Sequence, residues 1–297
     1  MPTSQSCLYC SSPLFKRRLF ATHEDERIFL FECAICKSQS LVPQPSDELL
    51  AEQYAGYYRK RVEGCTSPKS DYFAHIVRLI TEHFPSPQQA VDLGAGEGFF
   101  AQEFLRYIPS ATIDLVEQAG VPLVKQGTWQ GRATEYQLSI EDWIIAPPKP
   151  LSYDVVIALD ILEHLRDPAN FLHKVFHNLL KPSGILVLTT PNSSSLSRRL
   201  FGRLWPHYKI EHLTYPTPKA LHTVLATLPS TIIKLDPLTK QLPLKYCTNV
   251  LSNFGPAGSR FIGKALRHIL PGALSSQQVR FPTGESILLA RKCANPG

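Results

Sequence analysis

Apolar and polar positions alternate in a regular order of strands and helices from residue 71 onward. Residues 71–84 carry apolar side chains at a helical period, and short apolar runs follow at intervals, separated by segments of helical pattern. This alternation predicts an α/β fold with a doubly wound, mostly parallel sheet. We expect strands at 90–93, 112–116, 134–138, 153–160, 185–190, 230–235 and 286–291, and helices at 71–84, 99–107, 168–180 and 218–228.

Two Cys-x-x-Cys pairs precede this region, Cys7 with Cys10 and Cys33 with Cys36. Each pair fits a tight turn that directs two thiolates to one point, and two such turns provide the tetrahedral sulfur site that Zn²⁺ prefers. Four sulfur ligands leave no open position, so the ion should be structural. We therefore expect a zinc ribbon, with hairpin strands near 15–20 and 27–32.

A tyrosine-rich helix should follow the ribbon, with Ser46 as its cap. Tyr57 and Tyr58 in this helix either line a substrate entrance or pack the ribbon against the main domain. The expected organisation is a ribbon at 1–45, a helix and linker at 46–70, and a main domain at 71–297 that contains an insert at 236–284.

A glycine-rich turn, Asp92-Leu-Gly94-Ala-Gly96-Glu-Gly98, joins the first strand of the main domain to a helix. This arrangement forms a nucleotide-binding corner, because the missing side chains let a ligand contact the backbone at a helix N-terminus. A dinucleotide fingerprint would need a further glycine at position 99, which is Phe99. The next strand ends in Glu117, about 20 residues beyond the turn, where an acid suits a ribose diol.

Composition fits a globular protein with 43% hydrophobic and 19% charged residues, and no apolar run is long enough to span a bilayer. Seven cysteines, four of them in the two pairs, favour a reducing cytoplasmic location. The net charge of +6 is uneven, since residues 1–197 carry −5 and 198–297 carry +11. The basic last third either attracts anionic partners, with peripheral contact to a membrane as one case, or only aids solubility. Its amphipathic segment 260–270 fits a membrane surface or the core of the insert.

The acid followed by alternate glycines resembles motif I of class I S-adenosylmethionine-dependent methyltransferases. The run Asp160-Ile-Leu-Glu163-His164 resembles motif IV and the Glu-His turn of the ubiquinone-type O-methyltransferases, and the cysteine pairs resemble those of zinc-ribbon methyltransferases. The resemblance covers nearly the whole chain. It implies a doubly wound, seven-stranded Rossmann-like methyltransferase sheet, with an antiparallel C-terminal hairpin and a small N-terminal zinc ribbon.

The resemblance also implies that S-adenosylmethionine is the cofactor and methyl donor. An acid that holds the adenine usually follows the third strand, but Ser139 stands there, and Glu141, Asp142 or the backbone at Ile140 are the alternatives. The expected cofactor-binding residues are Asp92, Gly94, Ala95, Gly96, Gly98, Glu117, Ser139, Ile140 and Asp160.

In ubiquinone-type enzymes a set like Asp160, Glu163 and His164 can hold a divalent ion beside the substrate. This resemblance places the three residues, with Asp160 as a catalytic candidate, at the border of the reaction site. The competing interpretation is a helix-capping network with no second ion.

The loop after the fifth strand carries two histidines, His207 and His212. A histidine near neutral pKa suits the removal of a proton from a hydroxyl acceptor. We favour His212 as this base because its neighbours follow a family-like pattern, with His207 as the second candidate. The alternative is that His212 only shapes the loop. Arg198 and Arg199 nearby suggest an anionic acceptor.

The leading hypothesis is therefore methylation of a hydroxyl on a small or lipid-linked metabolite, with carbon or nitrogen acceptors left open. An oxidoreductase of the same topology is disfavoured by Phe99. A non-catalytic zinc-ribbon module that binds nucleic acid is disfavoured by the glycine turn and Glu117, so no nucleic-acid partner is expected. The sequence predicts no oligomeric state.

Overall fold

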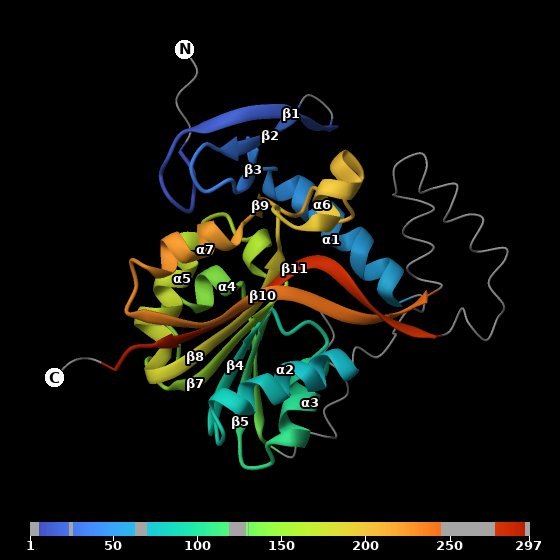
Figure 1. Cartoon of the computed structure of the whole chain (residues 1–297). Helices are drawn as coiled ribbons and strands as arrows, with labels where there is room; N and C mark the ends of the chain where they lie inside the picture. Colours follow the sequence, from blue (N-terminus) through green and yellow to red (C-terminus); the bar gives the residue numbers. More distant parts are fainter. Residues whose placement is uncertain are drawn as a thin grey trace.

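The computed structural model contains two β-sheets joined by helices (Figure 1). It describes residues 6–23, 26–62, 70–118, 129, 131–244 and 277–294, with side chains at all of these except 23, 55–62, 70, 240–243, 278 and 280–282. Tyr57, Tyr58 and the segment 260–270 fall outside the described side chains, so the expectations for them stay predictions. No helix in the described ranges is long and apolar enough to cross a membrane.

The larger sheet has seven strands in the order β10-β11-β8-β7-β4-β5-β6. Its central strands are parallel, and β11 is antiparallel to both β8 and β10. This confirms the doubly wound sheet with an antiparallel C-terminal pair. The strands are β4 (Gln89–Leu93), β5 (Thr112–Glu117), β6 (Ala133–Gln137), β7 (Tyr153–Leu159), β8 (Leu180–Pro191), β10 (Ser230–Pro243) and β11 (Gln278–Lys292).

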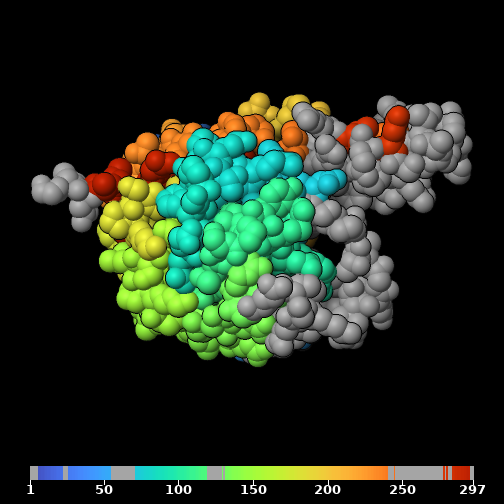
Figure 2. All heavy atoms as spheres, turned by 90° about the horizontal axis from the view of Figure 1, so that it is seen from below, coloured from blue at the N-terminus to red at the C-terminus, as the bar shows by residue number. Residues whose placement is uncertain are grey.

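Alternate residues of these strands face two separate hydrophobic cores, as the two-residue period of a strand requires. In β7, Val155 and Ile157 pack toward α2 (Ser70–His83) and α3 (Phe99–Tyr107), whereas Val156 and Ala158 face the opposite core. The view from below in Figure 2 shows α2 and the region of α3 covering one side of the molecule. The opposite face is covered by α4 (Ile140–Trp143), α5 (Pro168–Lys174), its π-helical continuation η3 (Val175–Leu179) and α7 (Pro218–Leu225).

Polar caps fix the starts of several helices. Asp167 accepts a hydrogen bond from the Asn170 N–H at 3.0 Å, directly before Pro168 opens α5. Thr217 does the same for Ala220 at 3.1 Å, at the start of α7. Each cap satisfies a backbone N–H that has no partner within the helix. Ser46 caps α1 (Asp47–Val62) through Leu49, as the sequence predicts.

The smaller sheet has the order β1-β2-β3-β9 and combines the N-terminal region with the loop after β8. Its strands are β1 (Leu14–His23), β2 (Glu26–Cys33), β3 (Gln39–Val42) and β9 (Thr214–Tyr215). A core of its own includes Ile28, Leu41, Trp205 and Tyr215. The loop between β8 and β9 contains α6 (Leu196–Phe201) and the 3₁₀ turn η4 (Gly202–Leu204). The N-terminal region and the main domain are thus joined by a shared sheet and core.

Several expected boundaries differ from those in the structure. The last two sheet strands pair as far as residues 243 and 278, so the segment between them is 244–277 rather than 236–284, and most of it lies outside the described residues. The predicted helix 168–180 changes to π geometry at Val175. The hairpin strands β1 and β2 are longer than 15–20 and 27–32, because pairing continues across two irregular positions in their register. The three-part division at residues 45 and 70 stays a prediction.

Candidate active site

The glycine turn follows β4 and is fixed to the neighbouring strand. The N–H groups of Gly94 and Ala95 both donate to the Val116 carbonyl, at 2.8 and 3.1 Å. Gly94 has φ +75°, and a Cβ there would lie 2.1 Å from the Ile161 side chain. Gly96 has φ +55°, and a Cβ there would meet no atom within 4 Å. The turn therefore needs glycine for its backbone at both positions, and the space over Gly96 is open to a ligand.

Two acids flank this turn. The Glu117 Oε2 accepts a hydrogen bond from the Gly96 N–H at 2.6 Å, and its Oε1 accepts one from the Gln118 N–H at 3.0 Å. Asp92 is 2% exposed, and its Oδ2 has no hydrogen-bond partner among the described residues. Burial, with a smaller contribution from Glu117, raises the pKa of Asp92 to about 8. A buried oxygen without a partner fits a site that a polar, cationic ligand completes.

Ser139 is the N-cap of α4 and is occupied in that role. Its Oγ accepts a hydrogen bond from the Asp142 N–H at 3.1 Å and donates to Asp142 Oδ2 at 2.6 Å. Ile140 lies over the turn, with its Cδ1 3.6 Å from the position of a Cβ on Gly94. Contact with an adenine ring thus falls more naturally to Ile140 and the local backbone than to the Ser139 hydroxyl.

Asp160 follows β7 in the left-handed region, with φ 58°. Its N–H donates to the Thr189 carbonyl at 3.0 Å, and its Oδ1 accepts from Thr189 Oγ1 at 2.8 Å. The hydroxyl of Tyr72 on α2 donates to the same Thr189 Oγ1 at 3.4 Å. These contacts hold Asp160 against the end of β8, beside Ile161, which covers Gly94.

Glu163, His164 and His212 form a buried cluster next to this position. One ligand atom from each lies within 4.8 Å of the others. Glu163 is 1% exposed and accepts a hydrogen bond from Thr190 Oγ1 at 3.0 Å. Burial, followed by the charge of Asp160, raises the pKa of Glu163 well above its usual value. A carboxylate and two imidazoles so placed can move a proton or bind a divalent ion.

His212 is held in its neutral form. Burial, and then the nearby His164, lower its pKa well below the usual value, so the ring is neutral at pH 7. Its Nδ1 is buried and has no hydrogen-bond partner among the described residues. Burial also lowers the pKa of His164, whose Nδ1 hydrogen-bonds the Tyr54 hydroxyl at 3.1 Å. Sequence reasoning missed Tyr54, although it belongs to the tyrosine-rich helix that was singled out.

The second histidine, His207, contacts the last strand of the larger sheet. His207 Nε2 forms a hydrogen bond with the Thr283 carbonyl at 2.9 Å, and its ring packs on Trp205 with centroids 4.9 Å apart. These contacts tie the loop to β11. The rings of His207 and His212 are 6.4 Å apart, and His212 also forms a hydrogen bond with the His207 backbone.

Arg198 and Arg199, the two arginines expected to attract an anionic acceptor, differ in their surroundings. Arg198 donates to the Tyr208 hydroxyl at 3.3 Å and lies 3.8 Å from a Glu32 oxygen on the ribbon. Arg199 is exposed to solvent on α6. Arg198 is thus partly neutralised by Glu32, because the loop packs on β2, a contact the sequence does not reveal.

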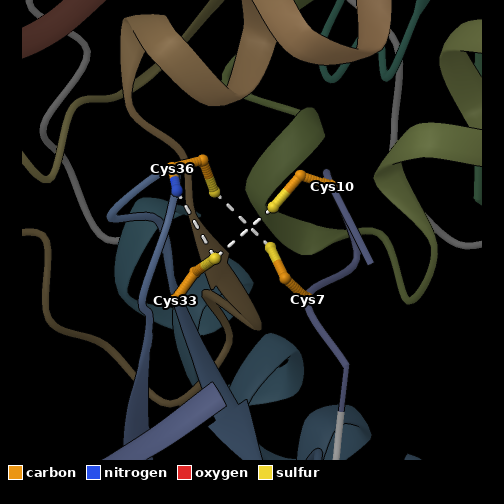
Figure 3. Close-up of side chains that lie close together, drawn as sticks. All are labelled: Cys7, Cys10, Cys33 and Cys36. Carbon is orange, nitrogen blue, oxygen red and sulfur yellow. Dashed lines mark hydrogen bonds between the residues drawn. The ribbon is translucent and has the colours of Figure 1, made fainter. Parts of the chain in front are cut away.

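The four paired cysteines converge on one point (Figure 3). The Cys7 and Cys36 sulfurs are 3.5 Å apart, and those of Cys10 and Cys33 are 3.4 Å apart. Four sulfurs at about 2.3 Å from a tetrahedral Zn²⁺ would be separated by roughly 3.8 Å, so a modest expansion accommodates the ion. Hydrogen bonds from Cys36 and Ser38 lower the pKa of Cys7 despite its burial, while the same contact with Cys7 raises the pKa of Cys36, so the pair shares one thiolate before a metal binds.

Comparison with known proteins agrees with this geometry. A mitochondrial ubiquinone biosynthesis O-methyltransferase of Schizosaccharomyces pombe is 28% identical over 162 residues, which cover 53% of this chain and 55% of that protein. The corresponding enzyme of Albidiferax ferrireducens is 34% identical over 113 residues, covering 37% of this chain and 44% of its own. The chain thus spans about half the length of the curated relatives it matches.

Solved structures share the fold. A Burkholderia thailandensis 1,6-didemethyltoxoflavin-N1-methyltransferase, with bound S-adenosylhomocysteine, covers 93% of this chain and 100% of its own, with a TM-score of 0.51 and 13% identity. A methyltransferase-like protein of Bacillus halodurans covers 74% and 99%, with a TM-score of 0.50 and 15% identity. The family described as "Methyltransferase domain" matches residues 66–228. With its glycine turn, strand order and family match in agreement, the chain belongs to the methyltransferase domain family.

Proposed function

We propose that this protein transfers a methyl group from S-adenosylmethionine to a hydroxyl oxygen of a small or lipid-linked acceptor. The observation that carries the proposal is the neutral, buried His212 with an unpartnered Nδ1, placed beside the end of β7 in a methyltransferase fold. The relatives named as O-methyltransferases support oxygen as the acceptor atom over carbon or nitrogen.

The cofactor would occupy the open space over the glycine turn. There the bound cofactor supplies an electrophilic methyl group on a sulfonium. Glu117 would receive the ribose diol and Asp92 the cationic end, because its oxygen lacks a partner and its charge would be stabilised by a cation. The full set proposed to contact the cofactor is Asp92, Gly94, Ala95, Gly96, Gly98, Glu117, Ile140, Asp160 and the backbone of Ser139.

In this proposal His212 accepts the proton of the acceptor hydroxyl at Nδ1 as the oxygen takes the methyl group. The imidazole is already neutral, so no prior loss of a proton is needed. Asp160, held by Thr189, would border the reacting atoms. The rest of the acceleration comes from alignment of acceptor and methyl group in a dry pocket, an effect of about 7–11 kcal/mol in favourable cases.

The same residues support a second, competing role for His212. Glu163, His164 and His212 would be the ligands of a divalent ion, which would polarise an acceptor oxygen. This set differs from the predicted Asp160, Glu163 and His164, because the ligand atoms that lie close together belong to Glu163, His164 and His212. Treatment with a chelator that leaves the ribbon zinc in place distinguishes the two roles. Activity should persist if His212 is a base, because a base needs no ion, and should be lost if His212 binds a divalent ion.

A lipid-linked acceptor is favoured by one surface of α6 and η4. Leu196, Leu200 and Leu204 are 65%, 60% and 39% exposed, with Arg199 and Arg203 exposed among them. No acidic residue occurs between 193 and 210. Exposed leucines with cations suit an anionic membrane surface. This face belongs to the loop that carries His212, so an acceptor held in a membrane would lie near the site.

The proposal is tested by labelled S-adenosylmethionine and a cell extract, followed by assays on the acceptor identified. His212→Gln should lower turnover by 10²–10⁴-fold, the usual effect of losing a general base, with cofactor affinity retained. His207→Gln serves as the comparison, and its turnover should stay within a few-fold of the parent. If His207→Gln lowers turnover more than His212→Gln does, the base is His207. If neither substitution lowers turnover, neither histidine takes part in the reaction.

A further inference from the structure

The segment that follows His212 is held on one side by the cysteine ribbon. Thr214 pairs with Ser40 and Tyr215 with Gln39, which adds β9 to the edge of β3. The Leu41 N–H also donates to the Leu213 carbonyl at 2.9 Å. The backbone directly beside the proposed base therefore belongs to the ribbon's sheet.

Both cysteine turns reach the same segment through buried hydrogen bonds. Tyr9, inside the Cys7–Cys10 turn, shares a hydrogen bond of 2.9 Å between its hydroxyl and Thr214 Oγ1. Tyr9 is 4% exposed and Thr214 is 0% exposed. In the second turn, the Cys36 carbonyl accepts a hydrogen bond of 2.6 Å from Thr217 Oγ1. The position of each contact depends on the cysteine turn that bears it.

The opposite side of the segment rests on the short 3₁₀ turn that follows β7. The Leu213 N–H donates to the Glu163 carbonyl at 2.8 Å, and the His212 ring packs edge-on against His164. His212 is thus placed between the ribbon and the catalytic end of the sheet. A shift of the cysteine turns would move Thr214 and Thr217, and with them the imidazole.

We propose that the metal-bound ribbon is a positioning element for His212, acting through the Tyr9–Thr214 and Thr217–Cys36 hydrogen bonds. This inference rests on the proposed function for the role of His212, but not for the coupling itself. The four-sulfur ion fixes the two turns, the turns fix residues 213–217, and these set the depth of the ring over Glu163. Tyr9 and Thr214 are positioning residues, since neither is placed against the reacting atoms.

The test is Tyr9→Phe in the full-length, zinc-loaded protein, studied by hydrogen exchange of peptides that cover residues 209–217. The matched control is Tyr153→Phe, which also removes a buried hydroxyl, bonded to Asp114 at 2.7 Å at the start of β7. Tyr9→Phe should retain its zinc and its cofactor affinity. Exchange in 209–217 should quicken about tenfold, as expected for losing one buried hydrogen bond, and kcat should fall with little change in KM.

Two further measurements sharpen the result. Tyr9→Phe combined with Thr214→Val should change exchange no more than either substitution alone, because both remove the same bond. Removal of zinc should quicken exchange in 209–217 as well as in the ribbon. Exchange in 209–217 that matches Tyr153→Phe, or that stays unchanged when the ribbon loses its ion, would overturn the coupling. A failure to find methyl transfer would instead remove the proposed function and leave the exchange result to decide the coupling.

Discussion

The ring of His212 stands edge-on to the ring of His164, with centroids 4.8 Å apart and planes at 87°. Burial and this neighbour both disfavour a charged His212 and hold its pKa well below the usual value. Because the base form then persists to lower pH, the acid limb of the kcat/KM profile should lie below pH 6.5, the ordinary histidine value. A pH–rate profile with constant ionic strength measures it. An acid limb at or above pH 6.5 would contradict a base at this position whose pKa is lowered.

The glycine turn offers a matched pair of substitutions. Gly96→Ala and Gly131→Ala both place a Cβ at positive φ, +55° and +73°, and neither Cβ meets an atom within 4 Å. Each should cost about 1 kcal/mol of stability from backbone strain. Gly96→Ala alone should weaken S-adenosylmethionine binding, by tenfold or more, because its Cβ enters the space proposed for the ligand. Calorimetry of the two variants tests the position of the cofactor. If both bind S-adenosylmethionine with equal affinity, the cofactor does not lie over Gly96.

Proton release should accompany cofactor binding. The pKa of Asp92 is about 8 without a ligand, above its unfolded value, so the carboxyl is mostly protonated at pH 7. A cation placed against it favours the carboxylate, and on the order of one proton should leave. Calorimetry at pH 7 in buffers of different ionisation enthalpy counts this proton, with Asp92→Asn as the control that should show none. By the same linkage, stability contributed by this group without a ligand is present below about pH 4 and lost as pH rises through 8.

Purified protein should contain close to one zinc ion per chain. Cys33→Ser should lose the ion and destabilise the ribbon, because metal binding is coupled to the folding of small sulfur sites. Cys293→Ser is the matched control, since Cys293 is a free thiol outside the cluster. Metal analysis with a thermal melt distinguishes the two. Full zinc content in Cys33→Ser would show that the four sulfurs are not the ligand set.

The surface of α6 should bind vesicles that contain anionic lipid. Leu196→Gln with Leu200→Gln removes two exposed leucines, each worth roughly 1 kcal/mol or more on burial in a membrane. Ile145→Gln with Leu151→Gln is the control, because these side chains are also exposed, at 64% and 48%, but lie elsewhere. Sedimentation with phosphatidylglycerol vesicles should show weaker binding for the α6 pair alone. If the two double variants bind the vesicles equally well, the α6 surface does not serve a membrane-held acceptor.

Much of the main domain could be predicted because its signals are local. Apolar runs marked the strands other than β6, whose sequence is largely polar, and Asp167 with Pro168 marked the start of α5. One local feature was not predicted: Ser183, in the turn before the buried part of β8, has a φ of 66°, in the region that glycine favours.

The candidate site could be predicted only in part, since its decisive contacts join distant segments. Nothing in a strand or helix period indicates that Tyr54 reaches His164, or that Arg198 reaches Glu32. The sequence also gives no indication that β3 pairs with β9, because β9 has only two residues. The residues were identified by their chemistry, while their neighbours followed from tertiary packing.

The edge shared by β3 and β9 also bears on the order in which the protein is made. Tyr9 and Thr214 are 205 positions apart, so the ribbon leaves the ribosome long before its fourth strand exists. At about 5–20 residues per second, the free edge of β3 waits roughly 10–40 s for its partner. During that interval an unpaired edge can join the strand of another chain. A protein with a self-contained ribbon would not meet this delay. Newly made chains of this protein should therefore depend more on rapid metal binding, and on a short interval between the synthesis of β3 and that of β9.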